Sequence, residues 1–344
     1  MNFVANTRKS NIELLRLVCM LMIVNLHTFC FPEFESGTPS HIGVFRLLDL
    51  IRESIAIPAV NIFVLISGYF SIKLKPKKLC SLLFQCYFWL ILIWGVMVGL
   101  GYATVTKNII INRLFFFNDS YWFIREFLVL MVISPFLNLV VGNLSLVKFR
   151  NYLVVYLAIQ VIYSIYATQP FGEGYTVASF IGLYLVGRYL RMSQFGSQIS
   201  MKTLLWALVG LVAVETAGAV VSMVLNNSDW YYYLLQYNNP VVIIEAIVIF
   251  LIFNKFNISS PIINYCSGSA LAIYLLHEHP DVEHLFLTYF RGDLYAVPVV
   301  QHIVILLLSF VAIFVVAILV DKLRLGIFNY LYPRCRKLLL KRAR

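Results

Sequence analysis

Residues 299–320 read VVQHIVILLLSFVAIFVVAILV, a run of 22 residues without lysine, arginine, aspartate or glutamate. The hydrocarbon core of a bilayer, about 30 Å thick, takes roughly 17–25 helical residues, so this run predicts a membrane-spanning helix. Nine further apolar runs lie near residues 12–32, 55–73, 79–103, 121–142, 150–168, 175–191, 203–225, 239–254 and 262–277. The sequence therefore predicts an all-α integral membrane protein, with one domain over residues 1–344 built as a bundle of about ten transmembrane helices.

The overall composition agrees with this fold class. Hydrophobic residues make up 61% of the 344 residues, charged residues only 12%, and the mean hydropathy is +0.84. Soluble globular proteins carry roughly 45–50% apolar and about 25% charged residues. The composition thus excludes a soluble enzyme, a disordered regulator and a nucleic-acid-binding protein, although the net charge is +11.

Two segments depart from the simple pattern of apolar runs. The ninth run contains a Ser-Gly-Ser sequence at residues 267–269, which predicts a broken helix. Residues 43–53 mix Arg46, Asp49 and Arg52 with leucines and isoleucines, a pattern typical of an amphipathic helix at the membrane interface.

The lysines and arginines are distributed unevenly over the predicted loops. If both termini are cytoplasmic, 21 of the 27 basic residues fall in cytoplasmic segments. Because positive charge concentrates on that side, we expect a multi-pass membrane protein with both termini inside and a basic cytoplasmic tail at residues 326–344. The other basic residues are Arg46, Arg52, Lys107, Arg113, Arg125 and Arg291.

The first apolar run carries two ionisable residues on one helical face. Arg16 and His27 lie eleven residues apart, so they differ by only about 20° around a helix and by about 16 Å along it. Histidine can take a proton from a hydroxyl, and arginine suits a phosphate or carboxylate. The alternative is a snorkelling arginine and a histidine that hydrogen-bonds to a neighbouring helix. Glu13 either forms a capping box with Ser10 or orients Arg16.

Other polar residues in or beside the runs allow two interpretations each. Glu215 and Glu245 lie mid-run, where each is either a proton-relay or substrate carboxylate, or a neutral acid bonded to another helix. The three histidines at residues 277–284 lie among three acids, but no HExxH pattern is present. We therefore expect no metal site there, and leave open a substrate lining or ordinary interfacial polarity.

The fourth run and the loop before the third run add further candidates. Trp122 suits an aromatic belt at the membrane interface, while Arg125 and Glu126 could contact a substrate. The lysines at residues 73–78 are an orientation signal and could also meet the phosphates of a soluble nucleotide carrier. No P-loop is present, which disfavours an ATP-driven machine.

Four stretches together resemble the membrane acyltransferase 3 family. They are Asn11-Ile-Glu13-Leu-Leu-Arg16 followed by His27, residues 61–70 (NIFVLISGYF), residues 121–124 (YWFI) with 134–138 (SPFLN), and residues 272–279 (AIYLLHEH). The resemblance extends from about residue 10 to 325, with all four stretches in the family's order and spacing. It implies a ten-helix enzyme of the type without a soluble esterase-like domain.

The resemblance also implies an activity and its partners. Such a protein is a membrane-bound O-acyltransferase that moves an acetyl or other short acyl group to a hydroxyl of a cell-surface sugar or polysaccharide precursor. Acetyl-CoA would be the acyl donor, with no permanently bound cofactor, and membrane lipid would surround the protein, in a bacterial inner membrane. The sequence leaves open the acceptor sugar, the acyl group, and whether His27 carries the acyl group itself.

The resemblance assigns roles residue by residue. His27 would be catalytic and Arg16 would bind acyl-CoA, because the two match the family's arginine and histidine. The sequence Lys75-Pro-Lys77-Lys78 is the nearest match to two arginines of the family, so Lys75 and Lys78 would also bind acyl-CoA. A lysine offers positive charge for a phosphate but not the two-pronged hydrogen bonding of an arginine. The acceptor would be held by Trp122, Arg125, Glu126, Tyr274, His277 and Glu278.

The main alternative is a transporter or flippase of glycolipid or polysaccharide. Such folds usually show internal repeats and paired interrupted helices, and neither is evident here. A polysaccharide polymerase, the second alternative, is expected to carry a large outer loop, which the sequence lacks. Stabilisation by CoA would distinguish an acyltransferase from a transporter.

Overall fold

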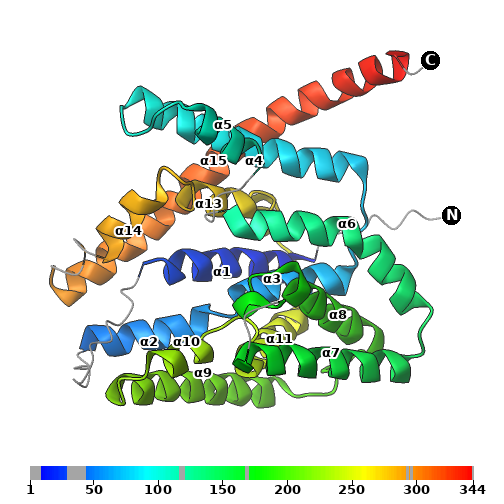
Figure 1. Ribbon diagram of the computed structural model, residues 1–344, viewed down its shortest axis with the longest axis vertical. Coiled ribbons are helices and arrows are strands. Elements are labelled where there is room, and N and C mark those ends of the chain that lie inside the picture. Colours follow the sequence, from blue (N-terminus) through cyan, green and yellow to red (C-terminus); the bar gives the residue numbers. More distant parts are fainter. Residues whose placement is uncertain are drawn as a thin grey trace.

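The computed structural model describes residues 9–28, 44–115, 121–166, 170–291, 294 and 297–342. All regular elements in these residues are helical, which confirms the all-α fold class (Figure 1). In chain order they are α1 Ser10–Leu26, α2 Val44–Ala56, α3 Ala59–Phe70, α4 Pro76–Gly99, α5 Lys107–Leu114, α6 Trp122–Gly142, α7 Leu146–Tyr166, the 3-10 turn η2 Gly172–Gly174, α8 Val177–Ser193, α9 Met201–Val224, α10 Ser228–Leu234, α11 Pro240–Lys255, α12 Pro261–Ser267, α13 Ala270–His277, α14 Glu283–Arg291 and α15 Val299–Arg342.

Every predicted apolar run contains a helix, but the helices differ in length. Within the described residues, six helical stretches are long and apolar enough to cross a membrane: Arg46–Phe70, Pro76–Gly99, Trp122–Gly142, Leu146–Tyr166, Met201–Val224 and Val299–Lys337. Helices α1, α8 and α11 have 17, 17 and 16 residues, and the ninth run is divided between α12 and α13. A membrane crossing therefore stays a prediction for each of these four runs, and so does the total of ten crossings.

Both segments that departed from the simple pattern are helical. The ninth run is broken, as predicted, between α12 and α13 at Gly268 and Ser269. The amphipathic stretch forms α2, and a short turn at Ile57 and Pro58 joins it to α3. The amphipathic helix α2 and the second run thus form one stretch, because Arg46–Phe70 as a whole is long and apolar enough for a membrane crossing.

Helix α1 occupies the middle of the bundle. It contacts α2, α3, α11, α12 and α13, and its residues Leu15, Cys19 and Val24 are completely buried. Figure 1 shows α4 and α15 on one side of α1, and α2 and α9 on the other. A helix so enclosed needs no wide apolar face toward lipid, and Arg16 and His27 can therefore face protein.

Helices α3 and α8 pack most closely, through glycines. A Cβ at Gly68 would lie 2.1 Å from the backbone oxygen of Tyr184, and one at Gly187 would lie 2.2 Å from that of Leu65. Small residues let two backbones approach in this way in membrane proteins. The contact also brings Tyr184 within 2.8 Å of Asn138 of α6, so three helices are joined there.

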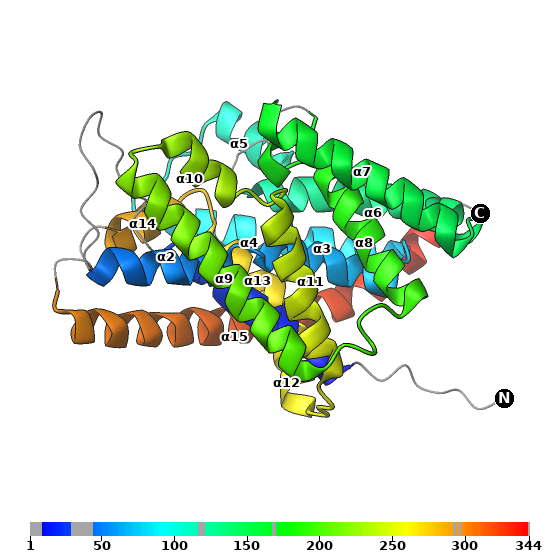
Figure 2. The same ribbon diagram turned by 90° about the horizontal axis from the view of Figure 1, so that it is seen from below.

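The last helix is much longer than a bilayer is thick. α15 has 44 residues, which corresponds to about 66 Å, against about 30 Å of hydrocarbon. Its C-terminal part projects from the bundle (Figure 1), so the predicted basic tail continues this helix as far as Arg342. The start of α1 and the end of α15 lie toward the same end of the bundle in Figures 1 and 2, as an even number of crossings requires.

Candidate functional site

Three polar side chains meet where α1 ends against α13. His27 is the C-terminal cap of α1, and His277 and Glu278 stand at the end of α13. The Nδ1 atom of His27 lies 3.0 Å from Oε1 of Glu278 and 3.2 Å from Nε2 of His277. The fold thus joins three predicted site residues whose positions differ by 250 residues along the chain.

The surrounding acceptors decide where the protons are. His277 Nδ1 lies 2.6 Å from the carbonyl oxygen of Ile273, which can only accept, so that nitrogen carries a hydrogen. The His277 ring is buried, and burial favours its neutral form, in which Nε2 is an acceptor. His27 Nδ1–H is therefore the donor to both Glu278 and His277, which leaves Nε2 of neutral His27 free to take a proton.

Glu278 supplies a negative charge at this point. Its carboxyl group is buried, with 6% of the residue exposed. Burial alone would raise the pKa of Glu278, but the charge and hydrogen bond of His27 hold that pKa below its usual value. The carboxylate is consequently ionised at neutral pH and orients the His27 ring.

A cavity of about 220 Å³ opens beside His27, and we call it the His27 cavity. Its polar lining is provided mainly by tyrosines and carboxylates; the lining residues are Leu26, His27, Glu53, Ile57, Glu173, Tyr175, Tyr231, Tyr232, Leu235, Gln236 and Tyr237. Tyr231 Oη donates to Glu53 Oε2 at 2.5 Å, and the rings of Tyr175 and Tyr237 lie 5.0 Å apart. These four residues are not among the predicted site residues, although the Tyr-Tyr-Tyr run at 231–233 was a visible signal in the sequence.

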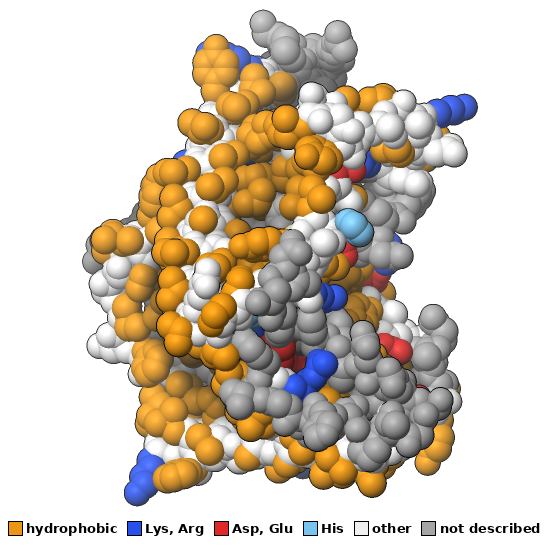
Figure 3. All heavy atoms as spheres, turned by 90° about the vertical axis from the view of Figure 1, so that its left-hand side faces the viewer, with side chains coloured by type: hydrophobic (Ala, Val, Ile, Leu, Met, Phe, Trp, Pro, Cys, Tyr) orange, Lys and Arg blue, Asp and Glu red, His pale blue; other side chains and the backbone are white. Residues whose placement is uncertain are grey.

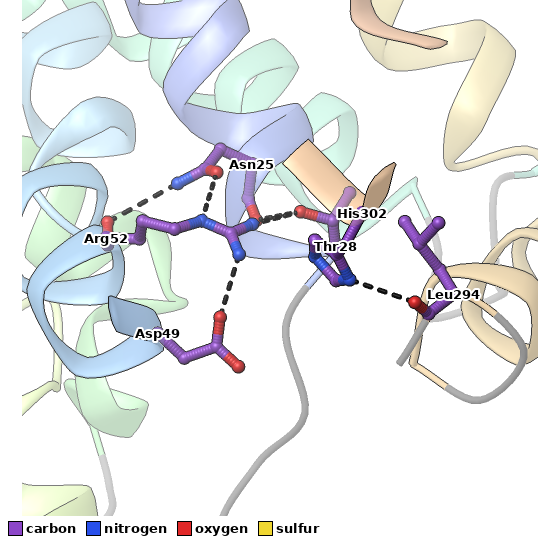
Figure 4. A network of polar contacts seen from close by, with 6 residues as sticks. All are labelled: Asn25, Thr28, Asp49, Arg52, Leu294 and His302. Carbon is purple, nitrogen blue, oxygen red and sulfur yellow. Dashed lines mark hydrogen bonds and ion pairs between the residues drawn. The ribbon is translucent and has the colours of Figure 1, made fainter. Parts of the chain in front are cut away.

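An arginine of α2 fixes the end of α1 that carries His27. Arg52 donates from Nε to Asn25 at 3.0 Å, from Nη2 to Thr28 at 2.7 Å and from Nη1 to Asp49 at 2.8 Å. Figure 4 shows the guanidinium group between these three side chains. Since Asn25 and Thr28 flank His27 in the chain, Arg52 holds the last turn of α1 in place.

The end of the molecule with α2 and α14 has a mixed surface. Figure 3 looks onto this end and shows acidic and basic side chains in a hollow, beside a broad band of hydrophobic side chains. The hydrophobic band suits contact with lipid, and the hollow suits a polar ligand. A lipid and a polar ligand can therefore bind next to each other at this end.

A second cavity, of about 450 Å³, lies along the first half of α1, and we call it the Arg16 cavity. Arg16 and Lys78, two of the residues predicted to bind acyl-CoA, both line it, and so do Ser67 and Ser267. Glu13 also lines it and accepts a hydrogen bond of 2.6 Å from Ser267.

The predicted capping box at the start of α1 is wrong. The helix begins at Ser10 itself and its N-terminal cap is Lys9, which makes no side-chain cap. Ser10 instead accepts a hydrogen bond from the backbone N–H of Ser260, at 3.0 Å. Glu13 is thereby available to Ser267, one turn away from Arg16.

Four predicted site residues lie apart from both groups. Lys75 is the exposed N-terminal cap of α4. Arg125 and Glu126 pair with each other at 3.0 Å, and Glu126 accepts from the backbone N–H of Val177, where α8 begins. The ring of Trp122 packs against Tyr237, at 6.0 Å between centroids, and so supports the wall of the His27 cavity.

The remaining residues of the ninth run take different places. Tyr274 is buried behind the site, its ring 6.2 Å from that of His277. His279 hydrogen-bonds to the backbone oxygen of Leu90 in α4, at 3.1 Å, and Asp281 pairs with Arg113 of α5 at 2.7 Å. The histidine and acid cluster of the sequence is therefore divided between the site and an anchor of the α13–α14 connection.

The site could also hold a metal ion. His27, His277 and Glu278 each offer one donor atom, and these atoms lie within 4.8 Å of one another. Two nitrogens and a carboxylate form a donor set that zinc accepts. The distances of 3.0 and 3.2 Å are equally those of the hydrogen bonds described above.

The two mid-run glutamates lie away from α1. Glu215 of α9 and Glu245 of α11 are completely buried, on helices that pack against each other. Neither lines the His27 cavity or the Arg16 cavity. Their place between two helices favours a pair of carboxyl groups that share a proton over contact with a substrate.

Comparison with known proteins gives one match. A family model described as an acyltransferase domain matches residues 9–322. No curated protein and no solved structure matches the chain. The matched segment begins just before α1 and ends within α15, so both cavities and all three residues of the His27 site lie inside it.

Proposed function

Because this chain belongs to the acyltransferase 3 family, and is thus a membrane acyltransferase, we propose that it transfers an acetyl or other short acyl group from acyl-CoA to a sugar hydroxyl. The observation that supports this most directly is the His27–Glu278 hydrogen bond of 3.0 Å beside a cavity rich in tyrosines. We further propose that the protein lies in a bacterial inner membrane, with both termini in the cytoplasm.

The Arg16 cavity suits the nucleotide end of acyl-CoA. Arg16 and Lys78 provide two positive charges for phosphate groups, and Ser67 and Ser267 add hydroxyl donors. Along α1 the cavity extends from Glu13 to Met20, which is about 10 Å of rise toward His27. A pantetheine arm that follows α1 would bring the thioester toward His27.

The reaction follows from the proton positions at His27. Nε2 of His27 takes the proton of the acceptor hydroxyl while the hydroxyl oxygen attacks the thioester carbonyl carbon. The carbon–sulfur bond then breaks, and the CoA thiolate receives the proton from His27, so that no net proton is consumed. Glu278 stabilises the imidazolium that forms between the two steps.

The His27 cavity suits a carbohydrate acceptor. Its tyrosine rings offer flat apolar faces and hydroxyl groups, while Glu53 and Glu173 accept hydrogen bonds from sugar hydroxyls. Water has less access to a half-enclosed pocket of this kind, which favours transfer to the sugar over hydrolysis.

Thermal unfolding of the detergent-solubilised protein, with and without CoA, tests the proposal. At a CoA concentration 100 times the dissociation constant, binding stabilises the folded state by about 2.7 kcal/mol, which raises the melting temperature. Arg16→Ala is expected to reduce this shift. The control is Arg150→Ala, which removes an exposed arginine of α7 and should leave the shift unchanged.

The outcomes are distinct. A CoA-dependent shift that only Arg16→Ala weakens supports an acyl-CoA site at the Arg16 cavity. A folded wild-type protein that shows no shift at saturating CoA would contradict the proposal and favour the transporter hypothesis. An equal shift in all three proteins would place the CoA site elsewhere.

A further inference from the structure

A long apolar groove runs along helix α9 toward the His27 end of the bundle. It encloses about 870 Å³ between α1, α2, α9 and α11. Among its described lining residues only Thr216 is polar, and the Thr216 hydroxyl already donates to Ser54 at 3.1 Å. The described side chains of the groove therefore offer no unused hydrogen-bond donor to an occupant.

The dimensions of the groove suit a hydrocarbon chain. Its lining along α9 extends from Leu208 to Val221, which corresponds to about 20 Å, or roughly two thirds of a bilayer's hydrocarbon thickness. Lining residues such as Val209, Val221 and Ile55 are about half exposed, so the groove is open along its length. Since α9 is long and apolar enough to cross a membrane, we expect that opening to face lipid.

Helix α2 separates this groove from the His27 cavity. Ile51 and Ile55 of α2 line the groove, whereas Glu53 and Ile57 line the His27 cavity. Positions two apart on a helix differ by about 200°, so Glu53 lies on the face of α2 opposite Ile51 and Ile55, and Ile57 follows in the turn after α2. The groove and the cavity thus share a wall that is a single helix thick.

The end of the groove leads to the mouth of that cavity. Helix α9 ends three residues after Val221 and is followed by α10, whose Tyr231 and Tyr232 line the His27 cavity. Arg46 precedes the groove residue Leu47 and is near enough for its charge to act on Tyr231. Figures 1 and 2 show α9 and α10 side by side at this end of the molecule.

We propose that the acceptor sugar is lipid-linked. Its hydrocarbon chain lies in the groove along α9, a phosphate that joins chain and sugar lies near Arg46, and the sugar enters the His27 cavity. This inference rests on the proposed acyl transfer and adds the chemical class of the acceptor. An ordinary boundary lipid accounts for an apolar groove, but not for a groove that ends beside a polar cavity whose Glu53 and Tyr231 lie within reach of the charge of Arg46.

Filling the groove tests the inference. Ala213→Trp and Ala217→Trp each place an indole into the groove from α9, where both alanines are exposed lining residues. Val214→Trp is the matched control, because Val214 is 59% exposed on the same helix and does not line the groove. The assay uses membranes of the cell in which the protein occurs, because they contain the acceptor even though its identity is not known. Radiolabelled acetyl-CoA is added to these membranes.

The label is then measured separately in lipids extracted into organic solvent and in water-soluble material. We expect it in the lipid fraction, with roughly tenfold less incorporation for the two groove variants and no change for the control, because the chain loses burial of several methylene groups. Incorporation at the wild-type level by the groove variants would overturn the inference while leaving acyl transfer intact. So would label that appears only in the water-soluble material. Label in neither fraction would instead contradict the proposed function.

A binding measurement decides the inference independently of catalysis. Hexadecyl phosphate with a photoreactive group in mid-chain is expected to cross-link to α9 and α2, and the Ala217→Trp variant to lose this cross-link while Val214→Trp keeps it. Arg46→Gln should weaken the same cross-link, since it removes the charge for the phosphate. Equal labelling of every lipid-facing helix, unaffected by Ala217→Trp, would mean that the groove holds only boundary lipid.

Discussion

At the scale of single residues, the proposed chemistry depends on one hydrogen bond, from His27 Nδ1 to Glu278. The arrangement resembles other histidine bases in that a carboxylate fixes the ring and stabilises its charged form. The second histidine, His277, adds an acceptor but cannot replace the negative charge. The contribution of Glu278 is therefore expected to be electrostatic as well as geometric.

Glu278→Gln tests that contribution. The amide keeps the shape but not the charge, so we expect acyl transfer to fall roughly 100-fold, with little change in the KM for acyl-CoA. Because His27 lowers the pKa of Glu278, the wild-type carboxylate is present above its ordinary pKa of about 4.3 and is lost as the pH falls through the lowered value. The loss in the variant should therefore be the same throughout the neutral pH range, where Glu278 stays ionised in the wild type. Glu126→Gln, in α6, is the control, and an equal loss in both would refute a special role for Glu278.

Arg52 is a positioning residue, and Arg52→Lys tests it. Lysine keeps the positive charge but cannot contact Asn25, Asp49 and Thr28 at once, so the last turn of α1 loosens. We expect roughly a tenfold lower kcat and an unchanged KM for acyl-CoA, because the misplaced group is the base and not the donor site. Arg125→Lys is the matched control. A KM effect alone, or wild-type kinetics, would show that Arg52 does not act through His27.

At the scale of elements, the close contact of α3 with α8 should dominate the stability of the bundle. Gly187→Ala places a methyl group against the backbone of Leu65, which forces the two helices apart and is expected to cost about 1–3 kcal/mol. Gly95→Ala is the control, because a Cβ there meets nothing within 4 Å. Unfolding in detergent measures both. Equal stabilities of the two variants would mean that α3 and α8 do not pack as described.

At the scale of the whole molecule, the side of the membrane on which each end lies is open to direct measurement. We expect a variant with Cys335 as its single cysteine to react with a membrane-impermeant maleimide only from the cytoplasmic side, since Cys335 is exposed near the end of α15. Reaction only from the other side would reverse the orientation and, with it, the assignment of the Arg16 cavity to acyl-CoA.

Local sequence features predicted much of this structure. The apolar runs located the helices, and Ser267 to Ser269 predicted the break between α12 and α13. These features depend on residues close in the chain. The contacts of Arg52, the pairing of Glu126 with the start of α8, and the tyrosines around His27 join distant segments, which periodicity alone cannot predict.

Acyl transfer by the His27→Ala variant is the measurement that tests the central claim most directly. Membrane vesicles with wild-type or variant protein receive radiolabelled acetyl-CoA, and label in glycan is counted, while the CoA-dependent rise in melting temperature verifies folding. The account predicts that the variant loses the transfer by a factor of roughly 100 to 10,000, as expected for removal of a general base, and retains the CoA shift. Transfer at the wild-type rate by the folded variant would contradict it.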